Sequence, residues 1–127
     1  MKKANCITLT LPLPPSVNAA YCNVAGVGRV KTKKYKEWEK EAYEACLTQP
    51  KYELEGNEWL EADYTYYMPI WCKNGNIKRI DTSNREKCTS DFIEKIIPGF
   101  KDEKIKRIIM EKKDSELNEV EIKIYEI

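Results

Sequence analysis

The chain has 127 residues, of which 34% are charged and 42% are hydrophobic, and its formal net charge is +1. This length and balance predict one folded domain over residues 1–127 with a modest core. The sequence contains no histidine. It therefore excludes Ser-His-Asp and Cys-His catalysis, a histidine general base and histidine metal ligands. An enzyme made from this chain must use carboxylates, Lys, Tyr, Cys or a metal.

The cysteine pattern and the apolar segments bear on the cellular location. The five cysteines are scattered, and no pair has the Cys-x-x-Cys spacing of a zinc site. The short apolar run after Lys3 does not resemble a signal peptide, and no segment is long enough to span a membrane. We therefore expect reduced, mostly buried thiols, no membrane association and a cytoplasmic location.

Two patterns dominate the first half of the chain. Residues 7–11 alternate between apolar and polar side chains, which predicts a strand, and prolines 12, 14 and 15 end it. We expect residues 16–31 to form a loop. Thr32 is a candidate N-cap for a helix that ends near Leu47. The buried stripe of that helix would comprise Tyr35, Trp38, Ala42 and Cys46.

The second half predicts more strands and one further helix. Residues 60–68 alternate clearly, and Asn74-Gly75 predicts a tight turn that returns residues 77–80 as a second strand. Ser83 is a candidate N-cap for a helix to about Ile97, and Glu86 would complete its capping box. The apolar side of this helix would comprise Cys88, Phe92, Ile93, Ile96 and Ile97.

Residues 105–112 and 120–124 read as the last two strands. The expected fold class is α+β, with a small, mostly antiparallel mixed sheet of four to five strands and two helices.

The charges are distributed unevenly along the chain. Residues 1–40 hold eight basic and only two acidic residues, whereas residues 41–66 hold seven acidic residues and one lysine. A run without acids begins after the glycine-containing loop and continues into the first helix. We favour a phosphate-binding surface for this run over an ordinary solvated face. The run comprises Arg29, Lys31, Lys33, Lys34 and Lys36.

Acidic residues recur around the second helix. Asp81 ends a predicted strand, Asp91 lies on the polar side of the helix, and Asp102-Glu103 follow the breaker Pro98-Gly99. Basic residues are interleaved with these acids. Carboxylates can hold a hard divalent cation while bases bind a phosphate backbone, so the pattern suits a metal-dependent phosphodiesterase. Spacing alone leaves solvated surface acids as an equal alternative. The interleaved bases are Lys78, Arg79, Arg85 and Lys87.

The order of these features resembles the RusA family of Holliday junction resolvases along most of the chain. The opening part of the resemblance is Pro14-Pro15-Ser16-Val17-Asn18, then Tyr21, Gly28-Arg29 and a basic helix with Trp38. The central part is Asp81-x-x-Asn84-x-x-Lys87-x-x-x-Asp91, and Asp102-Glu103 occupies the place of a later acidic pair.

The resemblance implies a homodimeric endonuclease that depends on Mg²⁺, with Mn²⁺ as an alternative, and nicks opposing strands of four-way DNA junctions. It further implies acids near the dimer interface and a bacterial cytoplasm, often with a phage or prophage origin. The expected metal ligands are Asp81, Asp102 and Glu103, with Lys87 and Asp91 as further catalytic residues. The expected DNA-binding residues are Asn18, Arg29, Lys31, Lys33, Lys34, Arg79 and Arg85.

Two positions depart from the family pattern. Ser83 stands where the family usually has a second Asp, and Glu103 replaces the second Asp of the later pair. Serine is a poor substitute for an anionic metal ligand. A non-catalytic branched-DNA-binding protein is therefore an alternative, and a small interaction module with an ordinary charged surface is another.

Overall fold

A four-stranded mixed sheet forms the centre of the protein. The computed structural model describes residues 2–3, 6–56, 58–78 and 82–127. The strand order is β2–β8–β6–β7, in which β8 pairs antiparallel with both neighbours and β6 pairs parallel with β7. The predicted α+β class and the mostly antiparallel mixed sheet are confirmed. The four strands are Cys6–Pro12 (β2), Leu60–Met68 (β6), Ile105–Asp114 (β7) and Glu119–Glu126 (β8).

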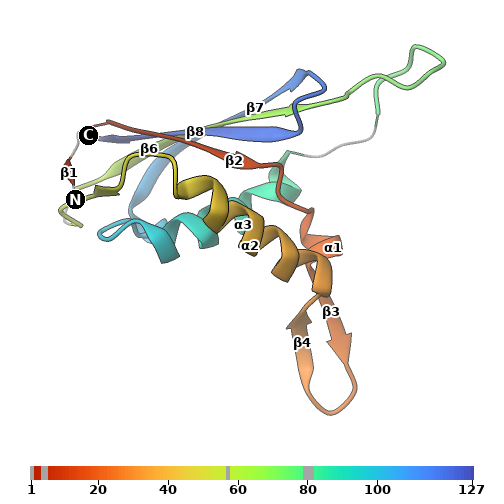
Figure 1. Cartoon of the computed structure of the whole chain (residues 1–127), viewed down its shortest axis with the longest axis horizontal. Coiled ribbons are helices and arrows are strands. Elements are labelled where there is room, and N and C mark those ends of the chain that lie inside the picture. Colours follow the sequence, from red (N-terminus) through yellow and green to blue (C-terminus); the bar gives the residue numbers. More distant parts are fainter. Residues whose placement is uncertain (1, 4–5, 57, 79–81) are drawn as a thin grey trace.

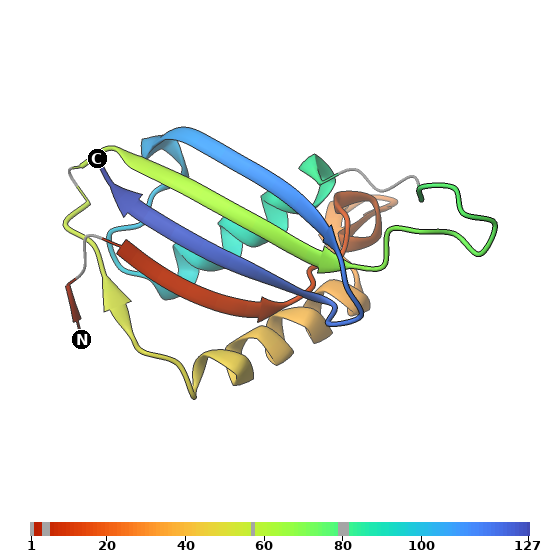
Figure 2. The same cartoon turned by 90° about the horizontal axis from the view of Figure 1, so that it is seen from above.

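Two long helices lie on the same face of this sheet (Figure 1). They are α2 (Lys33–Cys46) and α3 (Ser83–Ile96). Alternate residues of β2, β6 and β8 point into the layer between the sheet and the helices, where the core lies. Seen from above, the opposite face of the sheet carries no described helix (Figure 2).

The prediction of a plain loop over residues 16–31 is wrong. A short helix, α1 (Val17–Ala20), begins there, with the Ser16 Oγ accepting a hydrogen bond from the Ala19 amide at 3.3 Å. A β-hairpin follows, made of β3 (Tyr21–Val24) and β4 (Gly28–Lys31), and it projects from the body (Figure 1). The described part of the chain thus has three α-helices where two were predicted. The hairpin escaped prediction because its exposed strands lack apolar alternation.

Shorter elements complete the fold. β1 (Lys2–Lys3) pairs parallel with β5 (Tyr52–Glu53), and the 3₁₀ helix η1 (Asp102–Lys104) precedes β7.

The first long helix forms as its sequence predicts. The Thr32 side chain accepts a hydrogen bond from the Tyr35 amide at 3.3 Å, and its hydroxyl donates to the Ala19 carbonyl at 2.7 Å. The same residue therefore caps α2 and fixes α1 beside it. The buried face includes Tyr35 and Trp38, and the Trp38 indole N–H donates to the Pro12 carbonyl at 2.9 Å. Trp38 is a core residue, as expected.

The start of α3 differs from the prediction by one residue. Thr82 takes the cap position and makes no side-chain cap hydrogen bond, so the prediction of Ser83 as N-cap is wrong. Glu86 does not complete a capping box. Its carboxylate instead accepts a hydrogen bond from the Ser90 hydroxyl, one turn further along the helix, at 2.9 Å. The predicted apolar face is confirmed, with Phe92 and Ile93 fully buried.

Two buried hydroxyl pairs join α3 to the sheet. The Tyr64 and Ser90 hydroxyls lie 2.9 Å apart, and the Tyr66 and Thr89 hydroxyls lie 2.9 Å apart. Both tyrosines are on β6 and fully buried. Because a buried hydroxyl without a partner is costly, these pairs fix both the position and the rotation of α3.

The end of α3 is set by a close backbone approach. The Leu54 amide donates to the Pro98 carbonyl at 2.7 Å. Gly99 follows with φ at +87°, and a Cβ atom at that position would overlap the Leu54 carbonyl. Only glycine fits, and the chain then turns into η1 and β7.

A second arm, residues 69–78, extends beyond the end of the sheet (Figures 1 and 2). The predicted turn at Asn74-Gly75 is present, with Gly75 at φ +85°. Pairing is limited to one isolated bridge between Trp71 and Ile77, where a strand over residues 77–80 was predicted. Residues 79 and 80 of that predicted strand lie outside the described residues.

Replacing Tyr66 by Phe should lower the free energy of unfolding by about 1–2 kcal/mol, because the buried Thr89 hydroxyl loses a partner. Thr89→Val should cost a similar amount, since that hydroxyl also donates to the Arg85 carbonyl at 2.8 Å. In urea unfolding, the double variant should lose less than the sum of the single variants. Tyr67→Phe, on the opposite sheet face, is the control and should change little. Strictly additive losses would contradict the pairing.

Candidate functional site

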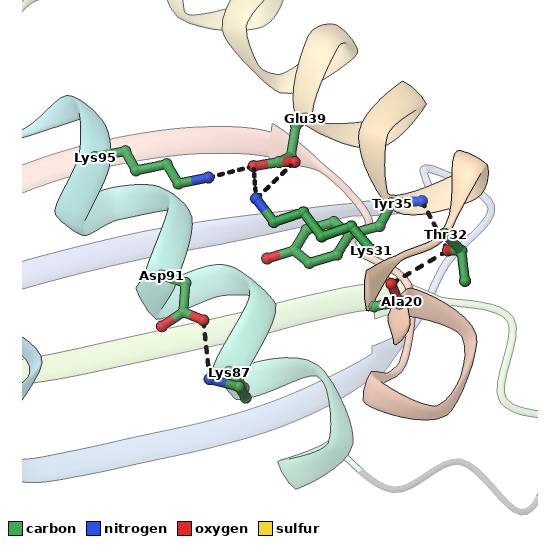
Figure 3. Close-up of polar contacts among 8 residues, drawn as sticks. All are labelled: Ala20, Lys31, Thr32, Tyr35, Glu39, Lys87, Asp91 and Lys95. Carbon is green, nitrogen blue, oxygen red and sulfur yellow. Dashed lines mark hydrogen bonds and ion pairs between the residues drawn. The ribbon is translucent and has the colours of Figure 1, made fainter. Parts of the chain in front are cut away.

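Lys87 and Asp91 form an ion pair on the outer side of α3. The Lys87 Nζ lies 3.1 Å from Asp91 Oδ2, and the pair is partly exposed (Figure 3). The hydrogen bond and the negative charge of Asp91 raise the pKa of Lys87 above its ordinary value. Lys87 is therefore a cation at neutral pH and suits charge stabilisation, not proton abstraction.

Asp102 and Glu103 lie beside each other in η1, near the C-terminal half of α3. The Asp102 amide donates to Glu94 Oε1 at 3.4 Å. Glu94 is eleven residues after Ser83, so about 16 Å of helix separates it from the start of α3. Thr82, the chain neighbour of Asp81, lies at that start. Asp81 and Arg79 themselves lie outside the described residues.

These positions bear on a metal site. Within residues 2–3, 6–56, 58–78 and 82–127, no three acidic or cysteine side chains group around one point. Asp102 and Glu103 are exposed, and adjacent carboxylates of this kind are suitable donors for a hard cation. The predicted set of Asp81, Asp102 and Glu103 stays a prediction, because one of its members is not described.

A pocket of about 270 Å³ lies beside Asp91. It lies where β3 and β4, α2 and α3 meet, so it brings the predicted Asp91 next to the predicted DNA-binding Lys31. Its lining residues are Tyr21, Lys31, Tyr35, Asp91, Glu94 and Lys95.

Glu39 is the central charge of this region. Lys31 Nζ lies 3.1 Å from both Glu39 carboxylate oxygens, and Lys95 Nζ lies 2.6 Å from Oε2 (Figure 3). The Glu39 side chain is only 14% exposed. Burial alone would raise its pKa, but the hydrogen bonds from Lys95 and Lys31 hold that pKa below its ordinary value. Glu39 therefore joins β4, α2 and α3 through charge.

Sequence reasoning missed Glu39 and Lys95. One signal was available for Glu39, which is one of only two acids within the strongly basic residues 1–40. An acid in a segment with few other acids is a candidate for an ion pair with the surrounding basic residues. Lys95 carried no comparable signal, because it meets Glu39 only after folding.

Two cations stack on tyrosine rings at the base of the β3–β4 hairpin. The Arg29 guanidinium carbon lies 4.6 Å from the Tyr21 ring centre, and Lys31 Nζ lies 5.1 Å from the Tyr35 ring centre. The two rings contact edge to face with centroids 5.3 Å apart. These contacts orient the hairpin, and Arg29 remains exposed.

The remaining predicted DNA-binding residues fall into two groups. Asn18, Lys33 and Lys34 are exposed on α1 and at the start of α2, and Lys33 Nζ lies 3.9 Å from a Glu37 oxygen in a well-exposed pair. Arg85 is half-buried and donates from Nη1 to the Pro14 carbonyl. Burial lowers the pKa of Arg85. Its present contact ties α3 to the turn after β2, which is a structural role.

The fold therefore places an exposed lysine–carboxylate pair between a cationic hairpin and an acidic 3₁₀ turn. Cations and carboxylates on one surface can bind a phosphate and a hard divalent cation. The family model described as endodeoxyribonuclease RusA matches residues 12–125. The chain belongs to the RusA family, whose members are endodeoxyribonucleases. No curated protein matches its sequence. Among the described residues, no helix is long and apolar enough to cross a membrane.

Glu39→Gln should destabilise the protein by about 1–2 kcal/mol at neutral pH, because charge-assisted hydrogen bonds to Lys31 and Lys95 are lost. The folded-state pKa of Glu39 is lowered, so its stabilisation is complete above the unfolded pKa of about 4.3 and is lost as pH falls through the folded value. The difference between wild type and variant in urea unfolding should shrink below about pH 4. A difference that does not change with pH would rule out this role.

Proposed function

We propose that the protein is a structure-selective DNA endonuclease that resolves four-way junctions by paired, metal-dependent nicks. Membership of the RusA family carries this proposal. It is supported by the cationic Lys87, which lies beside Asp91 and near the basic β3–β4 hairpin. Such a surface can bind the phosphates of a four-way junction without any base-specific contact.

Lys87 is proposed to stabilise charge on the scissile phosphate. Its ammonium carries three donors, and the contact with Asp91 uses one of them, so the others can reach a phosphate oxygen. Asp91 keeps the ammonium charged and in place. Arg29, Lys33 and Lys34 are proposed to bind the phosphates on either side.

Asp81, Asp102 and Glu103 are proposed to hold Mg²⁺ or Mn²⁺. Such a cation, when bound, activates a water molecule and neutralises charge on the phosphate. The side chains supply oxygen donors and negative charge, which suits a hard cation that keeps part of its water shell. Glu103 is about one methylene longer than the Asp of the family pattern, so its carboxylate can still approach the cation from a slightly more distant backbone position.

A homodimer is proposed as the working form, since the resemblance to the family implies a dimer with its acids near the interface. In such a dimer, one site can combine the Asp81 of one copy with the Asp102-Glu103 pair of the other.

Cleavage of a synthetic four-way junction tests the proposal. The wild type should nick opposing strands with Mg²⁺ or Mn²⁺ and not with EDTA. Asp81→Asn and Asp102→Asn should each lose about 100-fold or more in cleavage rate while still binding the junction. Lys87→Ala should lose about 10²–10³-fold. A wild type that binds junctions and never cuts them would contradict the nuclease proposal.

Co-expression of the Asp81→Asn and Asp102→Asn chains tests whether each active site takes its metal donors from two protomers or from one. If a site takes donors from two protomers, each mixed dimer keeps one intact site, and about one quarter of wild-type nicking should return. If each site lies within one protomer, the mixture should be as inactive as its parts, and the dimer proposal would be wrong.

A second candidate is a protein that binds branched DNA without cutting it. Ser83, where the family usually has a second Asp, favours this candidate because serine brings no negative charge to a cation. Such a protein would bind junctions equally well with and without Mg²⁺.

Salt dependence tests the predicted phosphate contacts. The Lys33→Ala/Lys34→Ala double variant should weaken junction binding and flatten the slope of log affinity against log salt by about 2. Lys51→Ala/Lys123→Ala changes the net charge equally at other places and should leave the slope unchanged. An equal effect of both double variants would show that net charge alone is responsible.

A further inference from the structure

We propose that the arm of residues 69–78 places Trp71 against an unstacked base at the branch point of the bound DNA. This inference rests on the proposed function and adds a recognition element to it. The arm is the second projection of the molecule, and the site described above does not include it (Figures 1 and 2).

The arm has a defined backbone conformation that is stabilised by hydrogen bonds. The Cys72 amide donates to the Asn76 carbonyl at 2.7 Å, and the Lys78 amide donates to the Ile70 carbonyl at 2.8 Å. The Ile70 amide donates to Asp114 Oδ1 at 3.1 Å, which ties the base of the arm to the end of β7. Gly75 makes the turn at its tip. Side chains on such an arm are presented in a defined direction.

Two large apolar side chains of the arm are exposed. Trp71 is 51% exposed and Ile77 is 59% exposed, and the two residues face each other across the single bridge. No described side chain makes a ring contact or a hydrogen bond with the Trp71 indole. Exposing a tryptophan and an isoleucine at the end of a projection is unfavourable in water, so a partner surface is expected there.

The charge of the arm indicates which partner. Residues 69–78 contain Lys73 and Lys78 and no acidic residue, in a chain with 21 acids. An exposed aromatic ring on an arm that also carries cations complements a nucleic acid, because a base can stack on the ring while lysines bind phosphates. Nucleic acid is the partner favoured here, because the chain belongs to a family of endodeoxyribonucleases. Bases at a branch point are already partly unstacked, which lowers the cost of the contact.

The place of the arm fits this function. It leaves the sheet at the end of β6 and leads along the chain towards α3, at whose start Thr82 lies. A base held by Trp71 would therefore lie at the same end of the molecule as the start of α3. Contact with an unstacked base would add to the discrimination between four-way junctions and duplex DNA, since the bases of a duplex remain stacked.

A matched control exists in the same chain. Trp59 is also 51% exposed, but its ring is covered by Lys104 and Lys106, with Nζ atoms 5.3 and 5.7 Å from the ring centre. It precedes β6, whereas the arm follows β6, so the two tryptophans lie at opposite ends of that strand.

The test is DNA binding by the full chain in EDTA, so that cleavage plays no part. The probes are a four-way junction with 2-aminopurine at the branch point and a duplex of the same sequence. Stacking of 2-aminopurine on the Trp71 indole should quench its fluorescence. Trp71→Ala should weaken junction binding about tenfold, change duplex binding less than about twofold, and abolish this quenching. Trp71→Phe should retain most of the junction binding, and Trp59→Ala should behave as the wild type.

Three other outcomes would contradict the inference, and each has a different meaning. If the wild type prefers the junction and Trp71→Ala does so equally, the arm does not read the branch point and the proposed function survives. If the wild type shows no junction preference, the proposed function itself fails. If Trp71→Ala converts a dimer into a monomer in sedimentation velocity, the arm packs on a second copy instead.

Discussion

The contact between β6 and α3 determines where every other functional group lies. Its buried hydroxyl pairs permit one rotation of the helix, since any other rotation would leave hydroxyls in an apolar layer without partners. With that rotation fixed, the apolar face of α3 points into the core and Lys87 and Asp91 point outward. Lys95, further along the outer side, then reaches Glu39 on α2. The pocket beside Asp91 is thus a consequence of core packing.

Much of the local structure could be predicted from the sequence. The cap of α2 at Thr32 and the buried face of α3 were both predictable, because each depends on residues close together in the chain. The hairpin of β3 and β4 was not predictable. Cation–ring contacts with Tyr21 and Tyr35 help to stabilise it, and no sequence pattern indicates such contacts. The N-cap of α3 is Thr82, one residue before the predicted Ser83, because the position of a helix end also depends on tertiary contacts.

The candidate site was predictable in residue type and less so in geometry. Charge and spacing indicated Lys87, Asp91 and the basic run, but could not indicate which cations would be neutralised within the fold. Lys31 and Arg85 were predicted to bind DNA, yet one faces Glu39 and the other faces a backbone carbonyl. Among the described members of this set, Arg29, Lys33 and Lys34 are the exposed cations. That any of these residues binds DNA stays a prediction.

The position of β8 has a consequence for how the chain reaches this fold. β8 is the last strand in sequence and lies between β2 and β6, so neither pairs with the other directly. Until residues 119–126 leave the ribosome, β2 and β6 each have an unpaired edge, and the apolar layer beneath them stays open. The sheet is therefore expected to assemble only once β8 has been synthesised, through contacts of long sequence separation. Unpaired strand edges can associate with other chains, so the pairing of β8 also protects β2 and β6 from such association.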